Sequence, residues 1–142
     1  MIYSYVHYCN IIWSGTYQAH VEPLTVLQKR AIRIITGQSY LAHTNNLFLQ
    51  ENILKFTDVN IYLTAIFMFK NLNKFKIFSS HNYNTRGKLL LRPEFQRISL
   101  TQQNISYRGP KIWNSLPEPI RNSRSLQIFK SNMRNYLTSK YQ

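Results

Sequence analysis

Acidic side chains are scarce in this chain of 142 residues, which has 5 Asp and Glu against 18 Lys and Arg. The five acids are Glu22, Glu51, Asp58, Glu94 and Glu118, and no two lie closer than seven positions apart. Enzymes that polymerise nucleotides hold two divalent metals about 3.5–4 Å apart with shared carboxylates. No Tyr-x-Asp-Asp or Phe-Ala-Asp-Asp turn is present. We therefore expect no catalysis of polymerisation by this chain alone.

Cysteine, histidine and glycine are also sparse. The single cysteine, Cys9, excludes an internal disulfide and a zinc site with two thiolates. The 4 histidines lie far apart in the sequence, and the 4 glycines form neither a P-loop nor a dinucleotide fingerprint. We expect no catalytic residues, no metal site, no cofactor and no small-molecule substrate. Cys9 lies in an apolar stretch, which favours a buried, unreactive thiol.

Long hydrophobic runs are missing too. The most apolar run, residues 61–69, ends at Lys70, whereas a membrane-spanning helix needs about 20 apolar residues. The amino terminus has neither a basic leading region nor a small-residue cleavage site, so it does not resemble a signal peptide. With one cysteine and no secretory signal, a cytoplasmic or nuclear location is expected.

Positive charge is what the chain has in excess, with a net charge of +13. Residues 1–28 carry −1, residues 29–76 carry +5 (seven basic less two acidic) and residues 77–142 carry +9 (eleven less two). Such an excess attracts polyanions, and counterion release favours binding to phosphates. We expect nucleic acid, RNA or DNA, bound with low sequence specificity, rather than a membrane surface.

The hydrophobic pattern predicts a mainly α fold. Helices are expected over residues 2–13, from Pro23 to a stop at Gly37, over residues 44–50, from a cap at Thr57 or Asp58 to residue 73, and from a cap at Ser125 to residue 139. Residues 89–91 and 95–100 resemble short strands. The predicted organisation is a helical lobe (1–75), a linker (76–85), and a basic arm with minor β structure that leads into a short C-terminal helical lobe (86–142).

The second predicted helix separates its apolar residues from its basic ones. At about 100° per residue, Leu24, Leu27, Ala31, Ile32, Ile34 and Ile35 fall on one face. Lys29, Arg30 and Arg33 cluster on the opposite face. Spacing alone does not distinguish a phosphate-contacting surface from an ordinary solvated helix face.

Residues 106–117, SYRGPKIWNSLP, have the most informative pattern of the chain. Tyr107, Trp113 and Leu116 are large side chains held between Gly109-Pro110 and Pro117, which predicts a short rigid helix or compact turn with Trp113 buried. The expected structural anchors of the fold are Trp13, Tyr107, Trp113, Leu116 and Phe129.

Five motifs in order resemble the region near the carboxyl end of reverse transcriptases from non-LTR (LINE-like, jockey-type) retrotransposons. They are residues 8–13 (YCNIIW), 27–35 (LQKRAIRII), 81–86 (HNYNTR), 106–117, and the helix from 129 to 137, which is similar to an FKxxL element. The resemblance implies that the first lobe is a polymerase thumb and that the parent activity is RNA-directed DNA polymerisation. The fingers, palm and endonuclease of that family are not in this chain.

The resemblance and the charge together predict a non-catalytic, nucleic-acid-binding C-terminal segment of a reverse transcriptase, which grips template–primer or element RNA. The rest of such an enzyme would be a natural partner. The residues expected to bind nucleic acid are Lys29, Arg30, Arg33, Arg86, Lys88, Arg92, Arg108 and Lys111. Two alternatives stay open: a degenerate transposon fragment without a selected function, and an independent basic binding or interaction module.

Overall fold

The computed structural model describes residues 7–13, 15, 17–75 and 90–141, and these residues are mainly helical with no strand among them. The mainly α fold class is therefore confirmed. The α-helices are α2 (Asn10–Trp13), α3 (Gln18–Ile35), α4 (Thr44–Gln50), α5 (Phe56–Lys70), α6 (Ile105–Ser115), α7 (Glu118–Arg121) and α8 (Leu126–Thr138), with 3-10 turns η1 (Leu72–Lys74), η2 (Thr101–Gln103) and η3 (Ser139–Tyr141).

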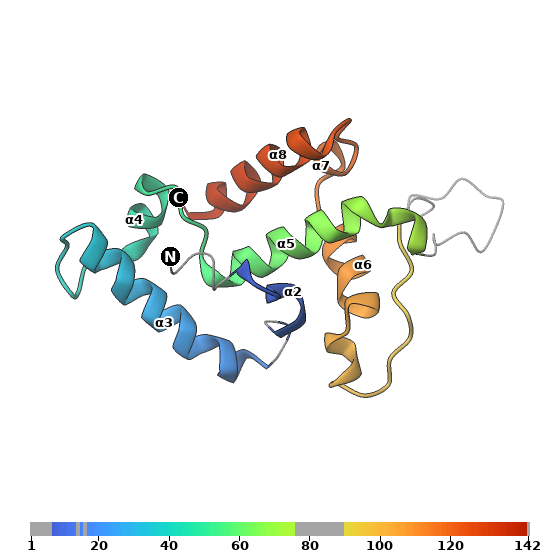
Figure 1. Cartoon of the computed structure of the whole chain (residues 1–142), viewed down its shortest axis with the longest axis horizontal. Helices are drawn as coiled ribbons and strands as arrows, with labels where there is room; N and C mark the ends of the chain where they lie inside the picture. Colours follow the sequence, from blue (N-terminus) through green and yellow to red (C-terminus); the bar gives the residue numbers. More distant parts are fainter. Residues whose placement is uncertain (1–6, 14, 16, 76–89, 142) are drawn as a thin grey trace.

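Helix α5 runs through the middle of the molecule, with α8 along one side and α6 crossing on another, while α3 and α4 lie beyond its amino-terminal end (Figure 1). Its sequence is apolar around almost its whole circumference, as a helix surrounded by others must be. The fully buried residues of α5 include Val59, Ala65 and Met68. This arrangement matches the central core helix that the sequence predicts.

The main core joins α5 to the helices that follow residue 90. Phe129 of α8 stacks on Phe69 of α5 with ring centroids 4.6 Å apart, and Trp113 of α6 lies 5.8 Å from Phe129. Leu116, Met133 and Leu137 are among the other buried residues of this core. Helices on both sides of the expected linker thus share one core, and the linker itself lies outside the described residues.

A second, smaller hydrophobic cluster lies near the start of α5. Ile32 of α3, Leu47 and Phe48 of α4, and Tyr141 of η3 form it. The Tyr141 hydroxyl donates to Asp58 Oδ2 (2.6 Å) and accepts from the Lys55 backbone N–H (2.9 Å). These two bonds attach the carboxyl-terminal turn to residues more than eighty positions earlier.

The predicted starts of two helices need correction. Helix α3 begins at Gln18, so Pro23 lies inside it rather than in its first turn. Helix α5 begins at Phe56, and neither Thr57 nor Asp58 caps it. The side chain of Gln28 takes over this role: its Oε1 accepts from the Phe56 N–H (2.7 Å) and its Nε2 donates to the Leu54 carbonyl (2.8 Å). Ser125 caps α8 as predicted, accepting from the Ile128 N–H.

The predicted helix over residues 2–13 is interrupted where the structure describes it: His7 and Asn10–Trp13 are helical, whereas Tyr8 and Cys9 form a turn. Cys9 has a left-handed backbone (φ 48°), which non-glycine residues adopt only in special turns. Helix α2 therefore contains only the four residues Asn10–Trp13. The same turn leaves Cys9 exposed, against the expectation of a buried thiol. Residues 2–6 lie outside the described residues.

No strand forms over residues 90–100, and of the expected minor β structure the described residues there have only a single β-bridge position, Leu91. Asn114 of α6 also holds Leu91: its Oδ1 accepts from the Leu91 N–H (3.0 Å) and its Nδ2 donates to the Leu91 carbonyl (2.8 Å). One side-chain amide supplies the donor and the acceptor that a neighbouring strand would offer. Position 89 lies outside the described residues.

Candidate nucleic-acid interface

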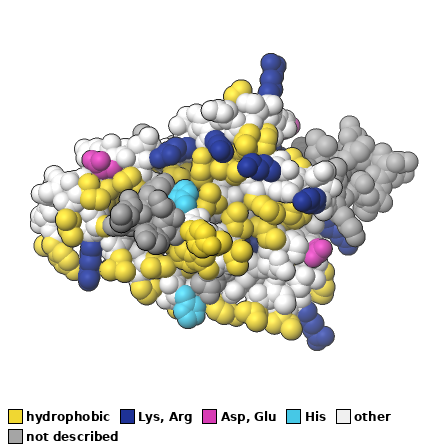
Figure 2. Space-filling view, viewed as in Figure 1, with side chains coloured by type: hydrophobic (Ala, Val, Ile, Leu, Met, Phe, Trp, Pro, Cys, Tyr) yellow, Lys and Arg dark blue, Asp and Glu magenta, His cyan; other side chains and the backbone are white. Residues whose placement is uncertain are grey.

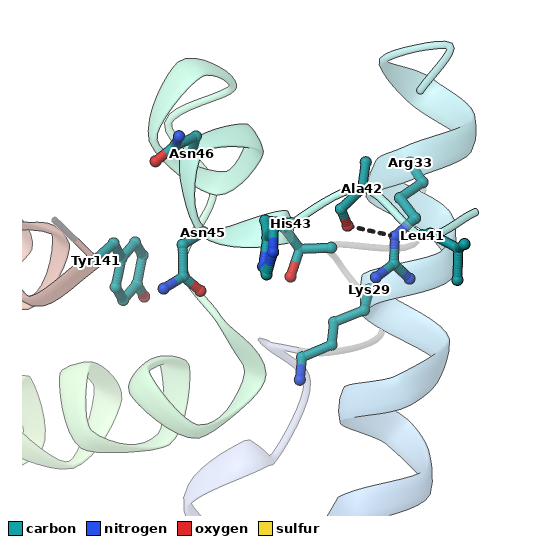
Figure 3. Close-up of a pocket in the computed structure, with 9 residues that line it drawn as sticks. Lys29, Arg33, Leu41, Ala42, His43, Asn45, Asn46 and Tyr141 are labelled. Atoms are coloured by element: carbon teal, nitrogen blue, oxygen red, sulfur yellow. Dashed lines mark hydrogen bonds between the residues drawn. The ribbon is translucent and has the colours of Figure 1, made fainter. Parts of the chain in front are cut away.

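Lys29 and Arg33 lie one turn apart on α3 and line the same cleft, which has a volume of about 530 Å³ (Figure 3). The other wall is formed by residues at and just before the start of α4, with Tyr141 closing one end. The lining includes His43, Asn45 and Asn46 as well as Leu41, Ala42 and Thr44. The cleft therefore combines two basic side chains with several hydrogen-bonding ones and contains no carboxylate among its lining residues.

Arg33 is fixed in place from both sides. Its Nε donates to the Ala42 carbonyl (2.9 Å), the bond drawn in Figure 3, and its guanidinium carbon lies 5.8 Å from the centroid of the Tyr40 ring. The bond to Ala42 uses Nε and not the two Nη groups at the end of the Arg33 guanidinium. That end is the part of arginine that binds phosphate or carboxylate oxygens in a bidentate manner.

A third cation, Lys55, supports the opposite wall. Its Nζ donates to Asn45 Oδ1 (3.0 Å) and lies 4.1 Å from the Tyr141 ring centroid. Burial lowers the pKa of Lys55; the carboxylate of Asp58 acts against this shift, and the positive charge of Lys29 adds to it. An anion in the cleft would relieve this mutual repulsion of cations, because opposite charge favours the protonated amine.

Arg30 lies on the neighbouring side of Arg33. It lines a second hollow, of about 480 Å³, together with Arg33, Ile34, Gln38 and Tyr40. The three cations predicted as one cluster on α3 are thus divided between two adjacent depressions, and Arg33 borders both.

Arg108 does not belong with the exposed cations. Its side chain is partly buried, and Nη2 donates to the Ile11 carbonyl (3.2 Å). The guanidinium packs so closely on Gly15 that a Cβ there would lie 2.3 Å from Nη1. Burial lowers the pKa of Arg108. Its position indicates a structural link between α6 and the segment around α2 rather than a surface contact.

The remaining predicted contacts are not part of the cleft. Lys111 is exposed on α6, where its Nζ donates to the Tyr107 hydroxyl (2.6 Å) and lies over that ring. Arg92 is exposed in the segment before α6. Arg86 and Lys88 lie outside the described residues.

The predicted anchors differ in their burial. Trp113, Leu116 and Phe129 are buried in the main core, and Tyr107 is partly exposed beside Lys111. Trp13 is 38% exposed, although its ring lies 5.5 Å from that of Phe56 and its Nε1 donates to the Tyr8 carbonyl (2.7 Å).

Sequence reasoning missed the whole second wall of the cleft. The polar run of His43, Asn45 and Asn46 is visible in the sequence, but such runs are common in loops and helix starts. Tyr141 carries no sequence signal at all, because its place depends on the return of the chain from α8 to α4. The sequence spacing predicted only the basic side of the cleft, which is formed by Lys29 and Arg33.

Basic side chains spread over other parts of the surface as well. Figure 2 shows Lys and Arg side chains in a row across the region where α8 lies in Figure 1, with few acidic side chains on the same face. The cleft on α3 is therefore one feature of a broadly cationic molecule. What distinguishes it is the concave shape and the converging polar groups.

No protein-family model, curated protein or solved structure matches this chain. Within the described residues, no three His, Cys, Asp or Glu side chains are grouped closely enough to hold a metal ion. None of the helices in these same ranges has both the length and the apolarity required to cross a bilayer.

Proposed function

We propose that this chain binds nucleic acid without catalysis, and that the cleft between α3 and α4 holds a phosphate of the strand. The observation that carries the proposal is the pairing of Lys29 and the oriented fork of Arg33 with Asn45 across a concave, carboxylate-free lining. The net charge of +13 supplies the long-range attraction to any nucleic acid. Little sequence preference is expected, because phosphate contacts carry no base information.

We further propose that the chain is the thumb and tail of a non-LTR retrotransposon reverse transcriptase. The five ordered motifs support this assignment, and the mainly α fold is the class that the assignment implies. In such an enzyme α3 would grip template–primer or element RNA. The scarcity of carboxylates supports a chain that cannot polymerise by itself.

Salt titration of binding tests the proposed cleft. Five to eight phosphate contacts on duplex would give a slope of log K against log salt of roughly −4 to −7. Replacing Lys29, Arg30 and Arg33 together by Gln should weaken binding to unrelated RNA and DNA oligomers alike. If all three contact phosphate, the slope should become shallower by up to about three units.

A matched variant separates a site from general charge. Lys70, Lys74 and Lys130 are exposed on other elements, and replacing them by Gln removes the same three charges. Fluorescence anisotropy should show a clearly smaller loss for this control. Equal losses for the two triple variants would mean that charge alone binds nucleic acid and that the cleft is not a site.

The absence of catalysis has its own assay. The purified chain with primed poly(rA), magnesium or manganese should incorporate no nucleotide. Template-dependent nucleotide incorporation that survives repurification and disappears in Asp58→Ala would overturn the prediction that the chain is not catalytic.

A further inference from the structure

Helix α3 presents an apolar stripe to solvent. Leu24 is 38% exposed, Leu27 57% and Ile34 80%, and Ala31 between them is partly exposed. At about 100° per residue these four side chains fall within an arc of about 80°. We call them the α3 seam.

The α3 seam is not the face by which the helix joins the rest of the molecule. That contact is made on another side of α3, by the buried Val21 and Ile32 and by Gln28, which bonds to the start of α5. Of the six apolar residues that share one face in the sequence pattern, Ile32 is buried, whereas Leu24, Leu27, Ile34 and Ile35 are exposed.

The spacing of the seam selects the shape of what can cover it. Its residues follow at intervals of three, four and three positions, which is the a/d pattern that packs against another helix. Ala31, at the centre, lets a second helix approach closely. Single exposed leucines are ordinary on protein surfaces, whereas several exposed apolar side chains in one contiguous patch are typical of interaction surfaces.

Charge specifies the partner further. Arg30 lies about 40° from Ile34 around the helix, and the second hollow places Arg30 and Arg33 beside Ile34 and Tyr40. Two guanidinium groups next to an apolar anchor fit a carboxylate side chain. A second copy of this chain fits poorly, because both copies would carry +13 and would bring Arg30 toward a basic surface.

We propose that the α3 seam binds an amphipathic helix of another protein, with leucine-type residues on its contact face and acidic residues flanking them. One of those acids pairs with Arg30 at the second hollow. This surface is separate from the proposed phosphate cleft, since none of the four seam residues lines that cleft.

The probe for this surface is a labelled peptide of about three heptads with Leu at a and d and Glu at e and g. It should bind the full chain at physiological ionic strength at least about tenfold more tightly than a scrambled peptide of the same composition. A peptide with Lys in place of Glu should bind more weakly than the Glu peptide. Equal binding of the Glu peptide and its scrambled form would overturn the proposal, because net charge would then explain both.

Variants locate the binding on the chain. Leu27→Ser/Ile34→Ser changes only exposed side chains and should lower peptide affinity at least about tenfold, while Val26→Ser, on another side of α3, should not. Arg30→Gln should weaken the Glu peptide about two- to fivefold, as expected for an exposed ion pair. Circular dichroism checks that each variant stays helical. Peptide binding that is unchanged in Leu27→Ser/Ile34→Ser would overturn the proposal.

Two other occupants are tested with the same variant. A concentration-dependent dimer in sedimentation velocity that Leu27→Ser/Ile34→Ser abolishes would assign the seam to a second copy and overturn the proposal. So would binding to phosphatidylserine vesicles that this variant abolishes while the Glu peptide fails to bind. Nucleic-acid affinity should stay unchanged in Leu27→Ser/Ile34→Ser, so failure here and failure of the proposed function give different results.

Discussion

The core around α5 and the outer side of α3 have similar apolar sequences but opposite surroundings. Phe129, Met133 and Met68 are 0% exposed, whereas Leu27 and Ile34 are 57% and 80% exposed. Both sets follow helical periodicity. The difference teaches that periodicity identifies which side chains share a face, and that only long-range packing decides whether the face is covered within the chain.

The largest contrast should appear when one residue from each region is truncated. Phe129→Ala removes a ring that stacks on Phe69 and Trp113, and such a loss costs about 3–5 kcal/mol. Leu27→Ala should change the free energy of unfolding by less than about 0.5 kcal/mol, because the side chain is exposed. Urea denaturation measures both. A Leu27→Ala cost close to that of Phe129→Ala would show that the outer side of α3 is buried in solution.

Filling space in the core should be the next most damaging change. A Cβ on Gly109 would lie 2.5 Å from the sulfur of Met68, which is fully buried. Gly109→Ala should therefore cost about 1–3 kcal/mol through overpacking. Adding Met68→Ala should make the combined loss clearly smaller than the sum of the two single losses. Additive losses would mean that the contact with Met68 is not the cause.

The smaller cluster should respond to the loss of one oxygen atom. Tyr141→Phe leaves Asp58 and the Lys55 N–H without their partner on Tyr141 and should cost about 1–3 kcal/mol. Tyr40→Phe, at a ring that is 68% exposed, serves as the control and should be near neutral. If the two variants unfold at the same denaturant concentration, the hydroxyl of Tyr141 does not hold the terminal turn.

The smallest expected effect concerns pH. Burial, with a further contribution from the charge of Arg134, lowers the pKa of His7 from its ordinary 6.5. The unfolded chain therefore takes up this proton first, so stability should fall as the pH drops through 6.5 toward the folded-state pKa. Replacing His7 by Gln should flatten this part of the profile of unfolding free energy against pH. An unchanged slope would assign it to other groups.

The positions of helices α4, α5 and α8 could largely be predicted because they rest on local patterns, and Trp113 is buried as predicted. Residues 44–50, the apolar circumference of α5 and the Ser125 cap of α8 are each visible within a few positions of the sequence. The start of α5 was mispredicted because Gln28, nearly thirty residues away, performs the capping. Local rules contain no information about such a distant partner.

The candidate site could be predicted only by half for the same reason. Lys29 and Arg33 are one helical turn apart, so spacing brings them together without any tertiary structure. Arg108 could not be distinguished from an exposed arginine, because its burial depends on Gly15 and Ile11 at the other end of the chain. The α3 seam is exposed because no other described element packs against it, and a local pattern cannot predict this.

The position of Tyr141 has a consequence for the order of events during synthesis. Among the residues that line the cleft it is the last to be made, and its partners Asp58 and Lys55 precede it by 83 and 86 positions. Contacts of such long sequence separation form late, since the loop between them must close first. Helix α3, which carries Lys29 and Arg33, can form well before the opposite wall of the cleft is complete. A nascent chain would therefore offer nucleic acid a charged helix at first, and a shaped cleft only after residue 141 has been added.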